Sequence, residues 1–140
     1  MPGVDWIGVL RADDRYQLPD PAEVSAVCAS ESALGVTLPS ALRALYLASD
    51  GVFDEPGQWF VIWPLAEVVA RNQAAWADGN HGRRRLLAFG DDGTGDLFCV
   101  PIGGGPEIVF WSAIDGTATH LARSLPLFWE AWTTDSLPPH

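Results

Sequence analysis

The chain of 140 residues has the length of one domain, and 48% hydrophobic against 19% charged residues predicts a folded core rather than a disordered segment. All its basic residues are arginine, which excludes chemistry that needs a lysine amine, such as a phosphate-binding P-loop or a Schiff base. The formal net charge of -10 argues against direct nucleic-acid binding, because an acidic surface repels phosphate groups.

The two cysteines and the first residues indicate a compartment. Cys28 and Cys99 stand in apolar stretches, which predicts two buried thiols in a reducing cytosol, with a single disulfide between them as the alternative. The segment from Met1 to Leu10 lacks the basic start and continuous apolar run of a signal peptide, and no window approaches the ~20 apolar residues of a membrane span. We therefore expect a cytoplasmic protein that binds no membrane.

Helical spacing dominates the first half of the chain, after residues 1–19, which show no regular pattern. A helix is expected between Asp20, as its N-cap, and Gly35, which suits a left-handed helix end. Further helices are expected to begin at Pro39 and at Pro64, and the apolar run from Trp59 to Trp63 reads as a buried strand. Three sets of side chains would form the apolar helix faces: Val24, Val27, Cys28 and Leu34; Leu38, Leu42, Leu45 and Tyr46; Leu65, Val68, Val69 and Trp76.

The second half changes to hairpin spacing. Four strands are expected, over Leu86–Phe89, Leu97–Ile102, Ile108–Trp111 and Thr117–Leu121, with glycine- and aspartate-rich turns between them. A last helix from Ser124 to about Thr133 follows. Helices first, an antiparallel meander next and a closing helix predict one α+β domain over residues 1–140, with a mostly antiparallel or mixed sheet flanked by about four helices.

Four stretches in this order resemble the SUKH superfamily. The first is Glu31-Ser-Ala-Leu-Gly35-Val-Thr-Leu-Pro39, followed by a helix that ends at Asp50-Gly51. The second, from Leu86 to Val100, has a strand, a glycine- and aspartate-rich turn and a strand. Ile108-Val-Phe-Trp111 with Asp115-Gly116, and a late helix around Phe128, complete the pattern. The resemblance covers about residues 23–133.

The resemblance implies a sheet with helices packed at its sides and a non-enzymatic protein-binding module. Bacterial members of the superfamily are typically immunity proteins that neutralise a toxin domain, often a nuclease, and fungal members regulate cell-wall assembly. We therefore expect an immunity protein with a basic toxin domain as its partner. The alternative is an intracellular regulatory or scaffold protein that binds cellular enzymes.

Loop acids are the candidate partner-binding residues. A nuclease needs a basic groove for its substrate, and an acidic protein is attracted to such a groove and associates quickly. The residues expected to line the interface are Asp54, Glu55, Asp91, Asp92, Asp96 and Asp115, with Trp59 as a possible anchor. Trp129 is a second tryptophan whose position predicts exposure.

Other chemistry finds weaker support in the sequence. The acids between Gly90 and Asp96 lack the alternating ligand pattern of a calcium loop and suit a tight turn. Cys99 could be paired with His120 as a nucleophile, but its apolar strand predicts an inert buried thiol. Arg83–Arg85 reads as a solvated loop. We expect no catalytic residue, no metal and no cofactor, and keep a small hydrolase with a carboxylate pair or Cys99 as a further alternative.

Overall fold

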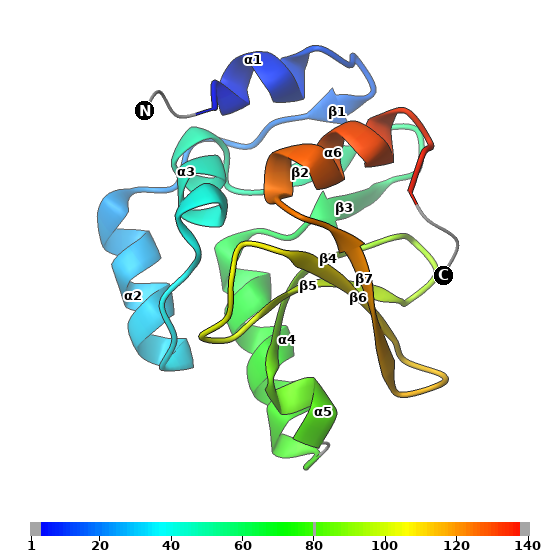
Figure 1. Cartoon of the computed structure of the whole chain (residues 1–140). Coiled ribbons are helices and arrows are strands. Elements are labelled where there is room, and N and C mark those ends of the chain that lie inside the picture. Colours follow the sequence, from blue (N-terminus) through cyan, green and yellow to red (C-terminus); the bar gives the residue numbers. More distant parts are fainter. Residues whose placement is uncertain (1–3, 80, 138–140) are drawn as a thin grey trace.

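Seven strands follow one another in chain order across a single antiparallel sheet in the computed structural model, which describes residues 4–79 and 81–137 (Figure 1). The strands are β1 (Tyr16–Gln17), β2 (Val52–Asp54), β3 (Trp59–Ile62), β4 (Leu86–Asp91), β5 (Leu97–Pro101), β6 (Ile108–Ser112) and β7 (Thr117–Ala122). The helices are α1 (Trp6–Arg11), α2 (Val24–Leu34), α3 (Ser40–Ala48), α4 (Leu65–Ala77), α5 (His81–Arg84) and α6 (Leu125–Thr133). The expected single α+β domain is confirmed.

Helix α6 occupies the inside of a strongly curved sheet. Phe128 of α6 packs edge-on against Phe89 of β4 and Phe98 of β5, with ring centroids 6.0 and 4.7 Å away. Trp132 of the same helix donates from Nε1 to the hydroxyl of Tyr16 in β1 over 2.9 Å. Because α6 also contacts β7, it touches both edge strands of the sheet (Figure 1).

Two carboxylates of the Glu31–Gly51 stretch have structural roles. Glu31 accepts a hydrogen bond from the backbone N–H of Leu38 over 2.7 Å and pairs with Arg43, which fixes the turn between α2 and α3. Asp50 accepts from the N–H of Leu65 over 2.9 Å and so supplies a cap for α4 from a distant part of the chain. The acidic positions of this motif therefore hold the first three long helices together.

The expectation that residues 1–19 are irregular is wrong for the part that the structure describes. They contain α1, whose first turn is capped by Asp5 Oδ1 accepting from Gly8 N over 3.2 Å. Trp6 and Leu10, four residues apart, are buried against the core, whereas Val9 is exposed. The helix is too short for its sequence period to be recognised.

Other boundaries and burial also differ. The predicted start of α2 at Asp20 is wrong, since the helix begins at Val24 and its cap position Glu23 makes no side-chain capping bond. Val24 and Cys28 are exposed rather than buried, and Trp129 is buried rather than exposed. Gly35 does end the helix in the left-handed region, with φ 71°. Asp54, expected in a loop, ends β2, and the expected loop Arg83–Arg85 includes the end of the short helix α5.

No helix in the described ranges is long and apolar enough to cross a membrane. Both thiols, Cys28 and Cys99, are free cysteines, so the alternative of a disulfide between them is wrong.

Candidate protein-binding surface

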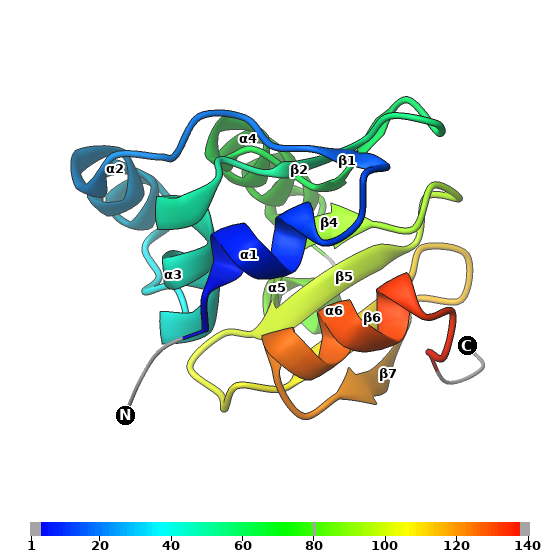
Figure 2. The ribbon, with the colours of Figure 1, turned by 90° about the horizontal axis from the view of Figure 1, so that it is seen from above.

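Four loops gather at one end of the sheet. They are residues 12–15 before β1, 55–58 between β2 and β3, 92–96 between β4 and β5, and 113–116 between β6 and β7. Each neighbouring pair of strands is antiparallel, so alternate connections of the meander return to the same end. Figure 2 shows these loops side by side along the right of the molecule.

Acidic side chains are concentrated at this end, which we call the acidic end. Its carboxylates are Asp13, Asp14, Glu55, Asp91, Asp92, Asp96 and Asp115. Arg15 is the basic residue of the four loops, and its charge is opposed by Asp54, with Nη2 3.2 Å from Oδ2. The fold therefore gathers five of the acids that sequence analysis selected, and adds Asp13 and Asp14 from a segment that showed no pattern.

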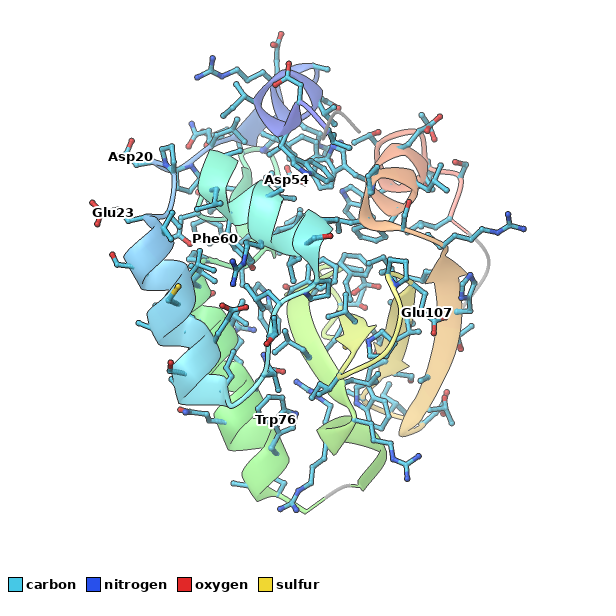
Figure 3. The ribbon with its side chains drawn as sticks, turned by 60° about the vertical axis from the view of Figure 1, so that its left-hand side comes forward. Asp20, Glu23, Asp54, Phe60, Trp76 and Glu107 are labelled. Atoms are coloured by element: carbon cyan, nitrogen blue, oxygen red, sulfur yellow. The ribbon has the colours of Figure 1, made fainter. Side chains whose placement is uncertain are left out.

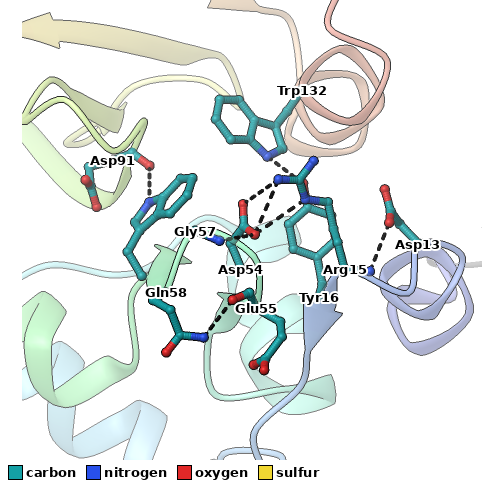
Figure 4. Close-up of polar contacts among 10 residues, drawn as sticks. Asp13, Arg15, Tyr16, Asp54, Glu55, Gly57, Gln58, Asp91 and Trp132 are labelled. Atoms are coloured by element: carbon teal, nitrogen blue, oxygen red, sulfur yellow. Dashed lines mark hydrogen bonds and ion pairs between the residues drawn. The ribbon is translucent and has the colours of Figure 1, made fainter.

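Asp54 is the exception among the selected acids. Its side chain is 1% exposed at the end of β2. The carboxylate accepts hydrogen bonds from the guanidinium of Arg15 and from the backbone N–H of Gly57, the latter over 3.2 Å (Figure 4). Asp54 is thus an internal support of the 55–58 turn rather than an acid displayed in a loop, and the expectation of a displayed carboxylate is wrong. Its neighbour Glu55 is exposed.

Trp59 joins two of the loops instead of projecting freely. Its Nε1 atom donates to the backbone oxygen of Asp91 over 3.3 Å. The indole ring lies against Gly57 and Gly93, where an added Cβ atom would be 2.1 and 3.4 Å from ring carbons. Trp59 is half-buried, so one part of the ring supports the loops and the rest is available to a partner.

Local hydrogen bonds hold the carboxylates of Asp91 and Asp92 in place. Asp91 accepts from Trp63 Nε1 over 2.9 Å and from Gly93 N over 3.1 Å. Asp92 accepts from both the backbone N–H and the hydroxyl of Thr94, over 2.9 and 2.6 Å. A carboxylate held in this way keeps its charge in one place, so little ordering is needed when a partner binds.

Asp96 and Asp115 connect the other side of the acidic end. Asp96 Oδ1 accepts from the backbone N–H of Ala113 over 3.1 Å, which ties the 92–96 loop to the 113–116 loop. Asp115 is exposed, and its backbone N–H donates to the hydroxyl of Ser112 over 3.2 Å. With the Trp59 contact, neighbouring loops are joined across three hairpins.

An aromatic groove of about 280 Å³ adjoins these loops. Phe53 and Phe60, both half-buried, stack edge to face inside it with ring centroids 5.0 Å apart. Arg71 lies over the ring of Trp63 at 4.5 Å. Phe53 was not identifiable from the sequence, because β2 is three residues long and follows a glycine that reads as a helix end. Phe60 lies in the strand predicted over Trp59–Trp63, but it is half-buried and lines the groove.

A larger and more apolar groove of about 530 Å³ runs between α1 and α6. Its walls include Val9, Pro126 and Trp129, with Asp13 and Glu130 among the lining residues. Since Asp13 also belongs to the 12–15 loop, this groove reaches the acidic end. The surface thus combines fixed negative charge with two apolar recesses, a composition suited to a protein partner.

The other candidate chemistries receive no support from the geometry. Burial raises the pKa of the Cys99 thiol to about 12, so the thiolate needed for nucleophilic attack does not form at neutral pH. His120 is exposed and faces Glu107, with Nδ1 2.9 Å from Oε2. Among the described residues there is no group of three or more His, Cys, Asp or Glu placed to hold a metal ion.

The arginine run also differs from expectation. Arg83 is buried and donates from Nη2 to Asn72 Oδ1 over 2.8 Å, so the expected solvated loop is wrong at this position. Arg84 and Arg85 are exposed. All three lie in or beside α5, outside the four loops of the acidic end.

One family model matches the chain over residues 21–130, and it describes the SMI1 / KNR4 family (SUKH-1). No curated protein matches the chain. The matched span includes three of the four acidic loops and excludes α1 and the 12–15 loop.

Proposed function

Because the chain belongs to the SMI1 / KNR4 (SUKH-1) family, whose members are protein-binding modules of the immunity or regulatory kind, we propose that it is a non-enzymatic immunity protein. In this proposal it acts in the cytosol and neutralises a cognate toxin domain by covering the toxin's basic, substrate-binding groove. The observation that carries the proposal is the acidic end, where four loops present carboxylates, several of them held by hydrogen bonds, beside an aromatic groove.

Electrostatics supports the choice of a basic partner. A nuclease toxin must bind phosphate, so its active-site groove is positively charged. Glu55, Asp92 and Asp115 lie on three neighbouring loops of the acidic end, and their combined field would orient such a groove during approach. Occlusion needs no catalytic group, which agrees with the inert Cys99 and with a family that is generally non-catalytic.

Apolar contacts would then hold the complex. The half-buried ring of Trp59 and the groove with Phe53 and Phe60 lie next to the carboxylates, and aromatic side chains in such positions often dominate binding energy. The α1–α6 groove would add apolar contacts, with one wall from α1, which lies outside the family-matched residues.

The experiment compares three baits in lysate of the source organism. The test bait carries Glu55→Gln, Asp92→Asn and Asp115→Asn. The matched control carries Asp20→Asn, Glu23→Gln and Asp78→Asn, which remove the same charge from exposed acids elsewhere; Asp20 and Glu23 point outward near α2 (Figure 3). We expect the unaltered and control baits to retain one basic protein, the test bait to lose it, and salt to release it.

The captured protein is then expressed with and without this chain. Growth arrest that this chain relieves, and that the test variant relieves less well, supports an immunity protein. Capture of several resident enzymes, none of them toxic, would instead favour an intracellular regulatory or scaffold protein. Equal capture by the test and control baits would contradict the acidic end as the binding surface.

A further inference from the structure

Strand β7 forms an open edge of the sheet. It pairs with β6 along one side only, since the strand order ends with it, and no described segment forms a backbone hydrogen bond to its other side. The opposite edge strand, β1, has two residues, whereas β7 has six. A strand of this length exposes a row of backbone donors and acceptors that can pair with another strand.

The residues along this edge do little to prevent such pairing. Thr117, Ala118, Thr119 and His120 are all exposed, and the stretch contains neither proline nor lysine or arginine, the residues that commonly protect edges. The one irregularity lies next to Leu121, where the β6–β7 register shifts. Thr117–His120 is therefore a regular, uncharged strand apart from the imidazole of His120.

Opposite charges stand at the two ends of the strand. Asp115 precedes β7 and Arg123 follows it, each four positions from Thr119, and both are exposed. Antiparallel pairing of two copies about Thr119 would bring Asp115 of each copy beside Arg123 of the second copy, twice in one interface. Parallel pairing would place like charges together.

We propose that β7 pairs antiparallel with β7 of a second copy, with the two-fold axis at Thr119, to form a homodimer with one continuous sheet. Two copies of a chain with net charge -10 repel one another over most of their surfaces. At this edge the acid Asp115 faces Arg123 of the second copy rather than another acid. Glu107, a carboxylate beside the strand, is bonded to His120, which would face Ala118 of the second copy (Figure 3). The dimer takes up Asp115 of the acidic end, whereas the 12–15, 55–58 and 92–96 loops adjoin other strands of the sheet.

Sedimentation velocity of the purified full chain over a concentration series tests the dimer. Asp115→Arg, Arg123→Asp and Thr119→Lys each place like charges across the two-fold axis, and each should raise the dimer dissociation constant about tenfold. The double variant Asp115→Arg/Arg123→Asp restores opposite charges and should return it to within about threefold of the unaltered protein. Asp78→Arg, an exposed site at the end of α4, is the control.

A protein that remains monomeric at about 1 mM would overturn the proposal, as would a dimer that ignores these charge changes. Crosslinking tests the two-fold axis itself. In a Cys28→Ser background, Thr119→Cys should form an intermolecular disulfide on mild oxidation. The Cα atoms of facing residues in antiparallel strands lie about 4.5–5.5 Å apart, which is within the range that a disulfide can span. The control is Ser32→Cys in the same background, on the exposed face of α2. If Thr119→Cys forms crosslinks no faster than this control, the two-fold axis at Thr119 is contradicted. No toxin takes part in either measurement, so the outcome is independent of the proposed function.

Discussion

Arg83 donates a hydrogen bond from Nη2 to Asn72 Oδ1 over 2.8 Å and so joins α5 to α4 inside the protein. The same Asn72 oxygen accepts from the backbone N–H of Ala88, and its Nδ2 donates to the Ala88 oxygen, each over 2.8 Å. Asn72 is fully buried, and burial lowers the pKa of Arg83. One amide therefore connects α4 to the central strand β4 and to a buried cation.

Replacing this amide should be costly. Asn72→Ala removes the partners of the Ala88 backbone groups and one partner of the Arg83 guanidinium in a site without solvent, so we expect a loss of about 3 kcal/mol in the free energy of unfolding. Urea denaturation followed by far-ultraviolet circular dichroism measures it. Arg85→Ala, two residues from Arg83 but exposed, should change stability by less than about 0.5 kcal/mol. Equal costs for the two variants would show that the network contributes nothing.

The arginine run illustrates what sequence patterns could predict of this fold. Hairpins between β4 and β7 were identifiable because glycine and aspartate mark their turns, and α3, α4 and α6 because their apolar residues repeat at helical spacing. Arg83 and Arg85 belong to the same run of three arginines, and nothing in the sequence distinguishes the buried side chain from the exposed one. Only the position of Asn72, brought beside them by the packing of α4 on β4, makes one of them internal.

Neighbouring acids at the acidic end should behave differently. Asp54→Ala removes the acceptor of Gly57 N and the partner of Arg15, and should cost about 1–3 kcal/mol, because Arg15 can turn partly to water. Glu55→Gln changes an exposed charge and should leave stability within about 0.5 kcal/mol. Thermal unfolding of the two variants compares them. A larger cost for Glu55→Gln would reverse the assignment of structural and displayed acid.

The convergence of the loop acids was implicit in the predicted meander, because alternate turns of antiparallel hairpins share one end of a sheet. Sequence analysis identified Asp91, Asp92, Asp96 and Asp115 but could not tell that Asp54 is internal. Its partner Arg15 lies in the loop just before β1, a strand of only two residues with no recognisable pattern. Pairing between segments far apart in the chain is the information that local patterns lack.

Gly57 and Trp59 should be energetically coupled. A methyl group at Gly57 would meet the indole ring at 2.1 Å, so Gly57→Ala should displace Trp59 and cost about 1–3 kcal/mol. In a Trp59→Ala background the same substitution should cost little, which gives a coupling energy of about 1 kcal/mol or more in a double-mutant cycle. Gly105→Ala, which meets open space, is the control. Additive costs would mean that the ring does not rest on the 55–58 turn.

Cys99 gives the protein a dependence of stability on alkaline pH. Burial raises the pKa of its thiol from 9.0 to about 12. Between these values the unfolded chain releases this proton while the folded chain keeps it, so stability is unchanged below about pH 9 and falls as pH rises toward 12. The loss from this thiol alone should be about 1 kcal/mol between pH 9 and 10.

Burial also raises the pKa of Tyr46, but from a higher ordinary value of 10.0, so its contribution begins about one pH unit later. Chemical denaturation at pH 8, 9 and 10 should therefore show a smaller fall in Cys99→Ala than in the unaltered chain. Cys28→Ala, which removes the other thiol from an exposed position, is the matched control. A slope that is the same in all three proteins would mean that Cys99 ionises as readily in the folded chain as in the unfolded one, which contradicts its position inside β5.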